Sequence, residues 1–121
     1  MAKSTRTPLE HFMAKMRKEF RSRETQKGWP HDDNVTIEYL VGLYHGQKGL
    51  CAHTGEPMTT VRGLVEGAVV FDLCTPDRID NTKGYTIGNI MLACDGINRM
   101  RSDMPLAKFR AFCKRIGMAA E

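Results

Sequence analysis

Residues 76–98 read PDRIDNTKGYTIGNIMLACDGIN, and this stretch decides the fold. Its middle part, DNTKGY, is rich in turn-forming residues, which predicts a loop. GNIML, which follows, predicts a short strand. ACDGINRMRSD then predicts a helical segment despite its glycine. We therefore expect a strand, a loop, a second strand and a helix in succession.

This unit is predicted to bring two oxygen ligands together. Asp77 lies at the end of the first strand and Asn98 lies one turn into the helix, so a hairpin packed on that helix places them side by side. Mg²⁺ takes few protein ligands, and a carboxylate with an amide carbonyl suffices to hold Mg²⁺ or Mn²⁺. Such an ion can offset charge on a phosphate and stabilise a leaving oxygen. Asn89, at the end of the loop, is expected to bond backbone groups and hold the loop closed.

These positions together resemble the HNH endonucleases of the ββα-metal (His-Me finger) superfamily. The pattern of that family is Asp-His, an Asn that closes the loop, and an Asn or His from the helix. Here it reads Asp77-Arg78, Asn89 and Asn98, with gaps of 12 and 9 residues that are close to the family's. LYHGQKGLCAHTGEPM is similar to the Q-G-x-C-A-x-T-G-x-P segment of many phage-borne members, and NRMRSD resembles the family's N-x-x-K ending. The resemblance covers roughly residues 37–104 and implies an α+β fold with a ββα-metal core, DNA as partner and metal-dependent phosphodiester hydrolysis.

Two departures from the family pattern change the expected chemistry, and the first concerns zinc. Many members hold a structural zinc ion with two Cys-x-x-Cys pairs, but here the second positions read Thr54 and Ile97. Cys51 and Cys94 alone cannot close a tetrahedral site, even though His53 could add a third ligand. We expect no structural zinc and interpret both cysteines as small apolar packing groups.

The second departure is Arg78, which stands where the family has its general base, a histidine. A guanidinium stays protonated, so Arg78 cannot accept a proton, although it can hold the scissile phosphate through two hydrogen bonds. DRID is also similar to the DRGH motif of the related non-specific nucleases, and in that register Asp80 takes the position of the base. Other candidates are His53, His45 and Tyr85, and a metal-activated water without any protein base is a further alternative.

Positive charge gathers at both ends of the chain. The net charge is +4, with eight Lys or Arg against three Glu in residues 3–27 and six against Asp103 alone in residues 99–115. This distribution is typical of a protein that binds a polyanion, and the expected partner is double-stranded DNA. The predicted DNA contacts are Arg17, Lys18, Arg21, Arg78, Lys83, Arg99 and Arg101.

We expect one domain, because 121 residues suit a single modest core. Its parts would be a basic helical N-terminal extension (1–36), the HNH-like core (37–104) and a C-terminal helix (105–121). The extension begins with the sequence TPLE, which predicts a capped helix start with Pro at the first helical position, and Gly28 predicts its end.

Other elements follow from local patterns. A second helix is predicted from residue 36 to about residue 45, and the last one from about 105 to 116, with Gly117 beyond its end. Short strands are predicted at 59–63 and 68–74, around a loop at 64–67. Trp29 is predicted to anchor the core.

Composition narrows the class of protein. A chain with 41% apolar and 26% charged residues fits a soluble globular protein, and its apolar runs are too short to span a bilayer. The basic N-terminus lacks the apolar run of a secretory signal, and the four cysteines lack the dense spacing of a secreted disulfide scaffold. We expect a reduced, cytoplasmic protein, of a bacterial host if a phage encodes it.

The predicted function of the protein is a metal-dependent DNA endonuclease that nicks or cuts both strands. The alternatives are a DNA-binding protein of the same fold with weakened or lost catalysis, and a small basic structural protein.

Overall fold

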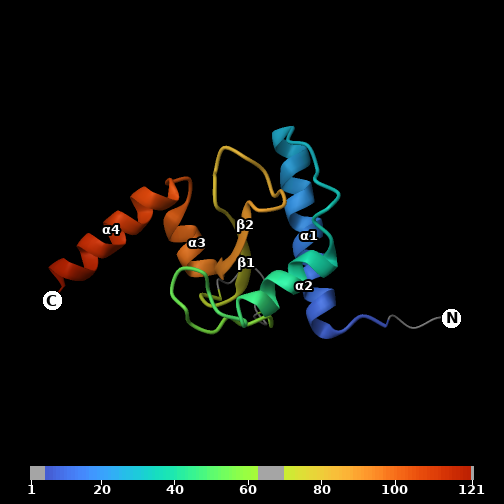
Figure 1. Cartoon of the computed structure of the whole chain (residues 1–121), viewed down its shortest axis with the longest axis horizontal. Coiled ribbons are helices and arrows are strands. Elements are labelled where there is room, and N and C mark those ends of the chain that lie inside the picture. Colours follow the sequence, from blue (N-terminus) through green and yellow to red (C-terminus); the bar gives the residue numbers. More distant parts are fainter. Residues whose placement is uncertain (1–4, 63–69, 121) are drawn as a thin grey trace.

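The computed structural model describes residues 5–62 and 70–120 of the chain. Within them, the elements in order are α1 (Pro8–Lys27), α2 (Ile37–Gly46), β1 (Cys74–Arg78), β2 (Ile90–Cys94), α3 (Asp95–Arg101) and α4 (Leu106–Ala119). The two strands form an antiparallel hairpin at the centre, with α1 and α2 to one side and α3 and α4 to the other (Figure 1). This arrangement confirms the predicted α+β class.

Helix α1 begins as the sequence predicts. The Thr7 side chain accepts a hydrogen bond from the Glu10 N–H, and the Glu10 carboxylate accepts one from the Thr7 N–H, which completes a capping box. The helix ends at Gly28, whose φ of 71° is the left-handed conformation that glycine adopts without steric cost. Both predicted ends are therefore confirmed.

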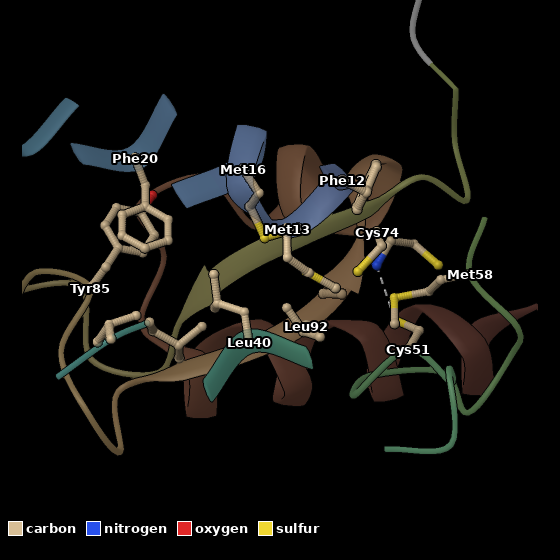
Figure 2. Close-up of a cluster of buried hydrophobic side chains, with 14 residues drawn as sticks. Phe12, Met13, Met16, Phe20, Leu40, Cys51, Met58, Cys74, Tyr85 and Leu92 are labelled. Carbon is tan, nitrogen blue, oxygen red and sulfur yellow. Dashed lines mark hydrogen bonds between the residues drawn. The ribbon is translucent and has the colours of Figure 1, made fainter. Parts of the chain in front are cut away.

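The apolar face of α1 is part of the main core. Its side chains Phe12, Met13, Met16 and Phe20 are buried and point toward the hairpin. Figure 2 shows Leu40 of α2 and Leu92 of β2 below them, with the Phe20 ring stacked on Tyr85 of the hairpin loop at a centroid distance of 4.7 Å. Because α1 supplies so much of this core, the described structure packs the predicted N-terminal extension and the predicted HNH-like core into one unit.

The hairpin pairs Asp77 with Met91 and Cys74 with Cys94, and α3 begins immediately after β2. The predicted strand, loop, strand and helix are therefore present in that order. The first strand begins later than predicted, at Cys74, and residues 59–62 form no strand, because Thr59 makes only an isolated bridge with Leu73. The predictions for residues 63–69 lie outside the described residues.

Two further predictions are wrong. Trp29 is half-buried and lies outside the main core, because its ring packs against charged side chains at the surface. Helix α4 continues through Gly117 to Ala119, since a glycine inside an otherwise regular helix is tolerated at modest cost. Figure 1 shows α4 projecting away from the hairpin.

Among the described residues, none of the helices has the length and apolar character needed to cross a membrane.

Candidate active site and nucleic-acid cleft

Asn89 closes the hairpin loop. Its Oδ1 accepts a hydrogen bond from the Asp80 N–H at 2.8 Å, and its Nδ2 donates to the carbonyls of Asp80 and Gly84. Since the side chain is 6% exposed, these bonds satisfy backbone groups at the base of the loop away from water. This geometry agrees with the predicted loop-holding role of Asn89.

Asn98 of α3 is tied to the strand that carries Asp77. Its Nδ2 donates to the Thr75 hydroxyl at 3.2 Å and to the Pro76 carbonyl at 3.1 Å. With the amide nitrogen used in this way, the Oδ1 atom is the one left for another partner. Asn98 and Asp77 both line one cleft of about 200 Å³, so the fold brings the two predicted metal ligands together.

Asp77 is buried, and both of its carboxylate oxygens have partners. Oδ1 accepts from Arg101 at 2.6 Å, and Oδ2 lies 2.7 Å from Nε2 of His53. The carboxylate, the guanidinium and the imidazole are all at most 5% exposed. Three segments far apart in the sequence therefore meet at Asp77.

The contact with Asp77 identifies the ring nitrogen of His53 that acts as donor. Its Nδ1 is buried without a partner among the described residues, whereas Nε2 faces the Asp77 carboxylate. An ionised carboxylate only accepts hydrogen bonds, so the nitrogen that faces it donates. Nε2 of His53 therefore donates to Asp77 and positions that carboxylate.

Arg101 holds the hairpin loop against α3. Besides Asp77, its guanidinium donates to the Asn81 side chain and to the carbonyls of residues 78, 79 and 104. The residue is 1% exposed, so it is not available to DNA in this arrangement, although the sequence predicts it as a contact. Its charge serves inside the protein, where it neutralises Asp77.

The carboxylate oxygens of Asp77 and the amide oxygen of Asn98 fit a hard divalent cation, which prefers oxygen ligands. Each carboxylate oxygen can accept more than one bond, so the contacts with Arg101 and His53 leave acceptor capacity on Asp77. A cation there would share the carboxylate with a fixed guanidinium, and this lowers the affinity expected of the site. Among the described residues, no three His, Cys, Asp or Glu side chains converge on one metal position.

Arg78 lines the same cleft and packs on aromatic rings. Its guanidinium lies 4.6 Å from the Trp29 ring centroid and 5.7 Å from that of Tyr85, and it donates to the carbonyls of Asn81 and Lys83. Stacking fixes the plane of the group while leaving N–H donors for a ligand. This geometry suits the predicted role of holding phosphate.

The other candidates for the base lie outside this cleft or are already engaged. Asp80 is exposed, and hydrogen bonds from the hydroxyl and N–H of Thr82 hold the pKa of its carboxyl below the usual value, which weakens it as a proton acceptor. Tyr85 lines the cleft but is buried against Phe20. His45 is exposed at the end of α2 and is not among the residues that line the cleft.

Three buried cysteines lie at the far end of the hairpin from the cleft. Cys74 and Cys94 are paired across the strands, and the Cys94 N–H donates to Sγ of Cys51 at 3.3 Å (Figure 2). Burial raises the pKa of Cys51, but N–H donors from Cys94, Thr54 and His53 outweigh it and bring the pKa to about 7. Burial raises the pKa of Cys74 and of Cys94 to about 12. All three cysteines belong to the packed core.

The remaining predicted DNA contacts divide into internal and exposed groups. Arg17 and Arg21 donate to backbone carbonyls of the segment between α1 and α2, at Val35 and Asp32, so they hold that segment in place. The exposed group consists of Lys18, Lys83 and Arg99. Of these, Arg99 forms an ion pair with Asp95 one turn earlier and lines a second cavity beside the cleft.

Two residues on α1 that line the cleft, Arg23 and Lys27, are not among the DNA contacts predicted from the sequence, and the contact of His53 with Asp77 is not predicted either. The charge count did include Arg23 and Lys27, but their position on the helix face became meaningful only once α1 was placed beside β1.

Comparison with protein-family models, with curated proteins and with solved structures gave no match.

Proposed function

We propose that this protein is a metal-dependent endonuclease of the HNH type that hydrolyses phosphodiester bonds in DNA. The observation that carries the proposal is a single cleft lined by Asp77, Arg78 and Asn98, with the cationic side chains of Arg23 and Lys27 on its opposite wall. Acidic and amide oxygens lie here beside cations that can bind phosphate, which is the combination that phosphodiester cleavage requires.

Each side chain has a distinct role in this proposal. Asp77 and Asn98 would hold Mg²⁺ or Mn²⁺, which when bound offsets charge on the phosphate and stabilises the leaving oxygen. Arg78, fixed by its stack on Trp29, binds the scissile phosphate. His53 and Asn89 are positioning residues: His53 orients the Asp77 carboxylate, and Asn89 keeps the loop closed.

The test is cleavage of supercoiled plasmid by the full chain with Mn²⁺, with and without a chelator. We expect nicking that the chelator abolishes and that Asp77→Asn lowers by at least about 100-fold, because the variant keeps the shape of the side chain but loses its charge. Asp33→Asn is the matched control, since Asp33 is exposed on the loop after α1 and should leave the rate unchanged. Equal nicking by Asp77→Asn and wild type would remove Asp77 from the site.

One observation favours a second function, a DNA-binding protein of the same fold without cleavage. The charge of Asp77 is already neutralised by Arg101 at 2.6 Å, so the carboxylate does not need a metal ion to be stable when buried. The same plasmid assay separates the two functions. Retarded but intact plasmid at every Mn²⁺ concentration selects binding without cleavage.

A further inference from the structure

Three cations line the cleft and lie close to aromatic rings. Arg78 and Lys27 lie over the Trp29 ring, at 4.6 and 5.5 Å from its centroid, and Arg23 lies 5.6 Å from the centroid of Tyr85. In the part of the chain that the structure describes, none of the three forms an ion pair. Asp77 and Asp103 also line the cleft, but Arg101 already neutralises Asp77, so the three cations face one uncompensated carboxylate and leave an excess of positive charge that an anion can neutralise.

The cleft continues into a second cavity of about 300 Å³. The two share Arg23, Pro76 and Asn98, and the second adds Arg62 and Arg99. Together they form a furrow that runs between α1 on one side and β1 with α3 on the other. Arg62 and Arg99 are paired with Glu19 and Asp95, which line the same cavity, so the excess of positive charge in this part of the furrow comes from Arg23.

The dimensions of the furrow limit what can enter it. Cavities of about 200 and 300 Å³ lie at or below the lower end of small-molecule clefts, roughly 300–1,000 Å³, so each holds only a short part of one nucleotide strand. A duplex also presents phosphates from two strands across a broad surface, whereas these cations line the walls of a single track. Proteins that bind single strands combine such a track with aromatic rings on which bases stack.

We propose that the furrow binds one unpaired nucleic-acid strand, so that the substrate is single-stranded DNA or DNA with a locally unpaired strand. The inference rests on the proposed nucleic-acid function and adds the form of the substrate, which the sequence alone predicts to be a duplex. The phosphates bind at Arg23, Lys27 and Arg78, and the strand continues past the Arg62–Glu19 and Arg99–Asp95 ion pairs. A base beside Arg78 stacks against the Trp29–Arg78 pair, and because Trp29 is the one tryptophan of the chain, its fluorescence reports this contact.

The experiment measures binding without metal, in a chelator, by fluorescence anisotropy. The probes are a labelled oligothymidylate of about 16 nucleotides, near the upper site size of single-strand modules, and a hairpin duplex of the same length. We expect the single strand to bind at least tenfold more tightly and to quench Trp29. Similar affinity for the two probes, or tighter binding of the duplex, would overturn the proposal.

Two double variants test whether the single strand binds in the furrow. Replacing both Arg23 and Lys27 with Gln should weaken single-strand binding about tenfold and reduce the slope of log K against log salt by about 1.4, since each lost phosphate contact contributes about 0.7. Lys108→Gln with Lys114→Gln is the matched control, because both residues are exposed on α4 and removing them changes net charge equally. Equal losses of single-strand affinity in the two double variants would mean that net charge alone explains the effect. That result would contradict binding of the strand in the furrow.

A competition experiment distinguishes binding of a nucleic-acid strand from binding of a single phosphate ion. Inorganic phosphate at equal phosphate concentration should fail to displace the oligonucleotide, since an ion occupies one position of the track. Full displacement would reduce the furrow to a phosphate pocket and overturn the proposal. Cleavage plays no part in these measurements, so an inactive protein that binds single strands would contradict the endonuclease proposal alone.

Discussion

Arg101 brings a positive charge into the interior of the chain, where five hydrogen bonds hold it. Its acceptors lie at the end of β1, in the following loop and at residue 104 beyond α3. A buried ion pair stabilises little compared with an apolar replacement, but removing one partner leaves the other charge buried and uncompensated. Arg101 is therefore a residue whose loss disturbs both the fold and the cleft.

Arg101→Ala should lower the free energy of unfolding by about 3–5 kcal/mol, because Asp77 would remain buried without its cation. Urea denaturation followed by circular dichroism measures the change. The control is Arg99→Ala, two residues earlier on α3, whose side chain is 63% exposed in an ion pair with Asp95; it should cost no more than about 1 kcal/mol. Comparable costs in the two variants would contradict the role assigned to Arg101.

Helix α1 supports the hairpin loop as well as the core. Its Glu24 is fully buried, accepts a hydrogen bond from the Tyr85 N–H at 3.2 Å and pairs with Arg21 at 3.4 Å. Figure 1 shows the loop between β1 and β2 beside the C-terminal end of α1. The helix therefore determines how the loop that borders the cleft is held.

Glu24→Ala should cost about 1–3 kcal/mol, since it leaves the Tyr85 N–H buried without an acceptor. It should also speed hydrogen exchange at that amide relative to the amides of β2. Glu19→Ala on the same helix is the control: its carboxylate is 46% exposed and pairs with Arg62 at the surface, so the expected cost is below about 1 kcal/mol. Unchanged exchange at Tyr85 in Glu24→Ala would show that α1 does not hold the loop.

Elements with strong local signals could be predicted from the sequence, and contacts between distant segments could not. The capping box at Thr7 and the glycine stop at Gly28 are encoded within a few residues of each helix end, and both predictions are confirmed. The meeting of His53, Asp77 and Arg101 joins positions 24 residues apart, for which no local periodicity exists. Basic residues illustrate the same limit, because a charge count cannot distinguish a buried arginine from an exposed one.

Considered as a whole, the molecule divides into a packed body and a projecting helix. The Phe109 ring, which is 6% exposed, fastens the first turn of α4 beside His53 at a centroid distance of 5.9 Å. From residue 110 to residue 120 the helix is exposed. Most of α4 therefore contributes little to the stability of the body.

Deleting residues 114–121 should change the free energy of unfolding by no more than about 0.5 kcal/mol, because exposed residues without special contacts contribute little. Phe109→Ala is the contrasting variant and should cost about 3 kcal/mol through the cavity it leaves. Thermal unfolding of both proteins gives the comparison. A large loss of stability in the truncated chain would mean that the distal part of α4 packs on the body.

The convergence at Asp77 has a consequence for the order of folding. Its two partners lie 24 residues before it and 24 residues after it, so ordering the carboxylate requires two separate loop closures, each of which costs chain entropy before any contact forms. Helices α1 and α2 need only local contacts and can form earlier. A chain caught partway through folding would therefore have its helices but no cleft, and the ability to hold a ligand would be the last property that the molecule acquires.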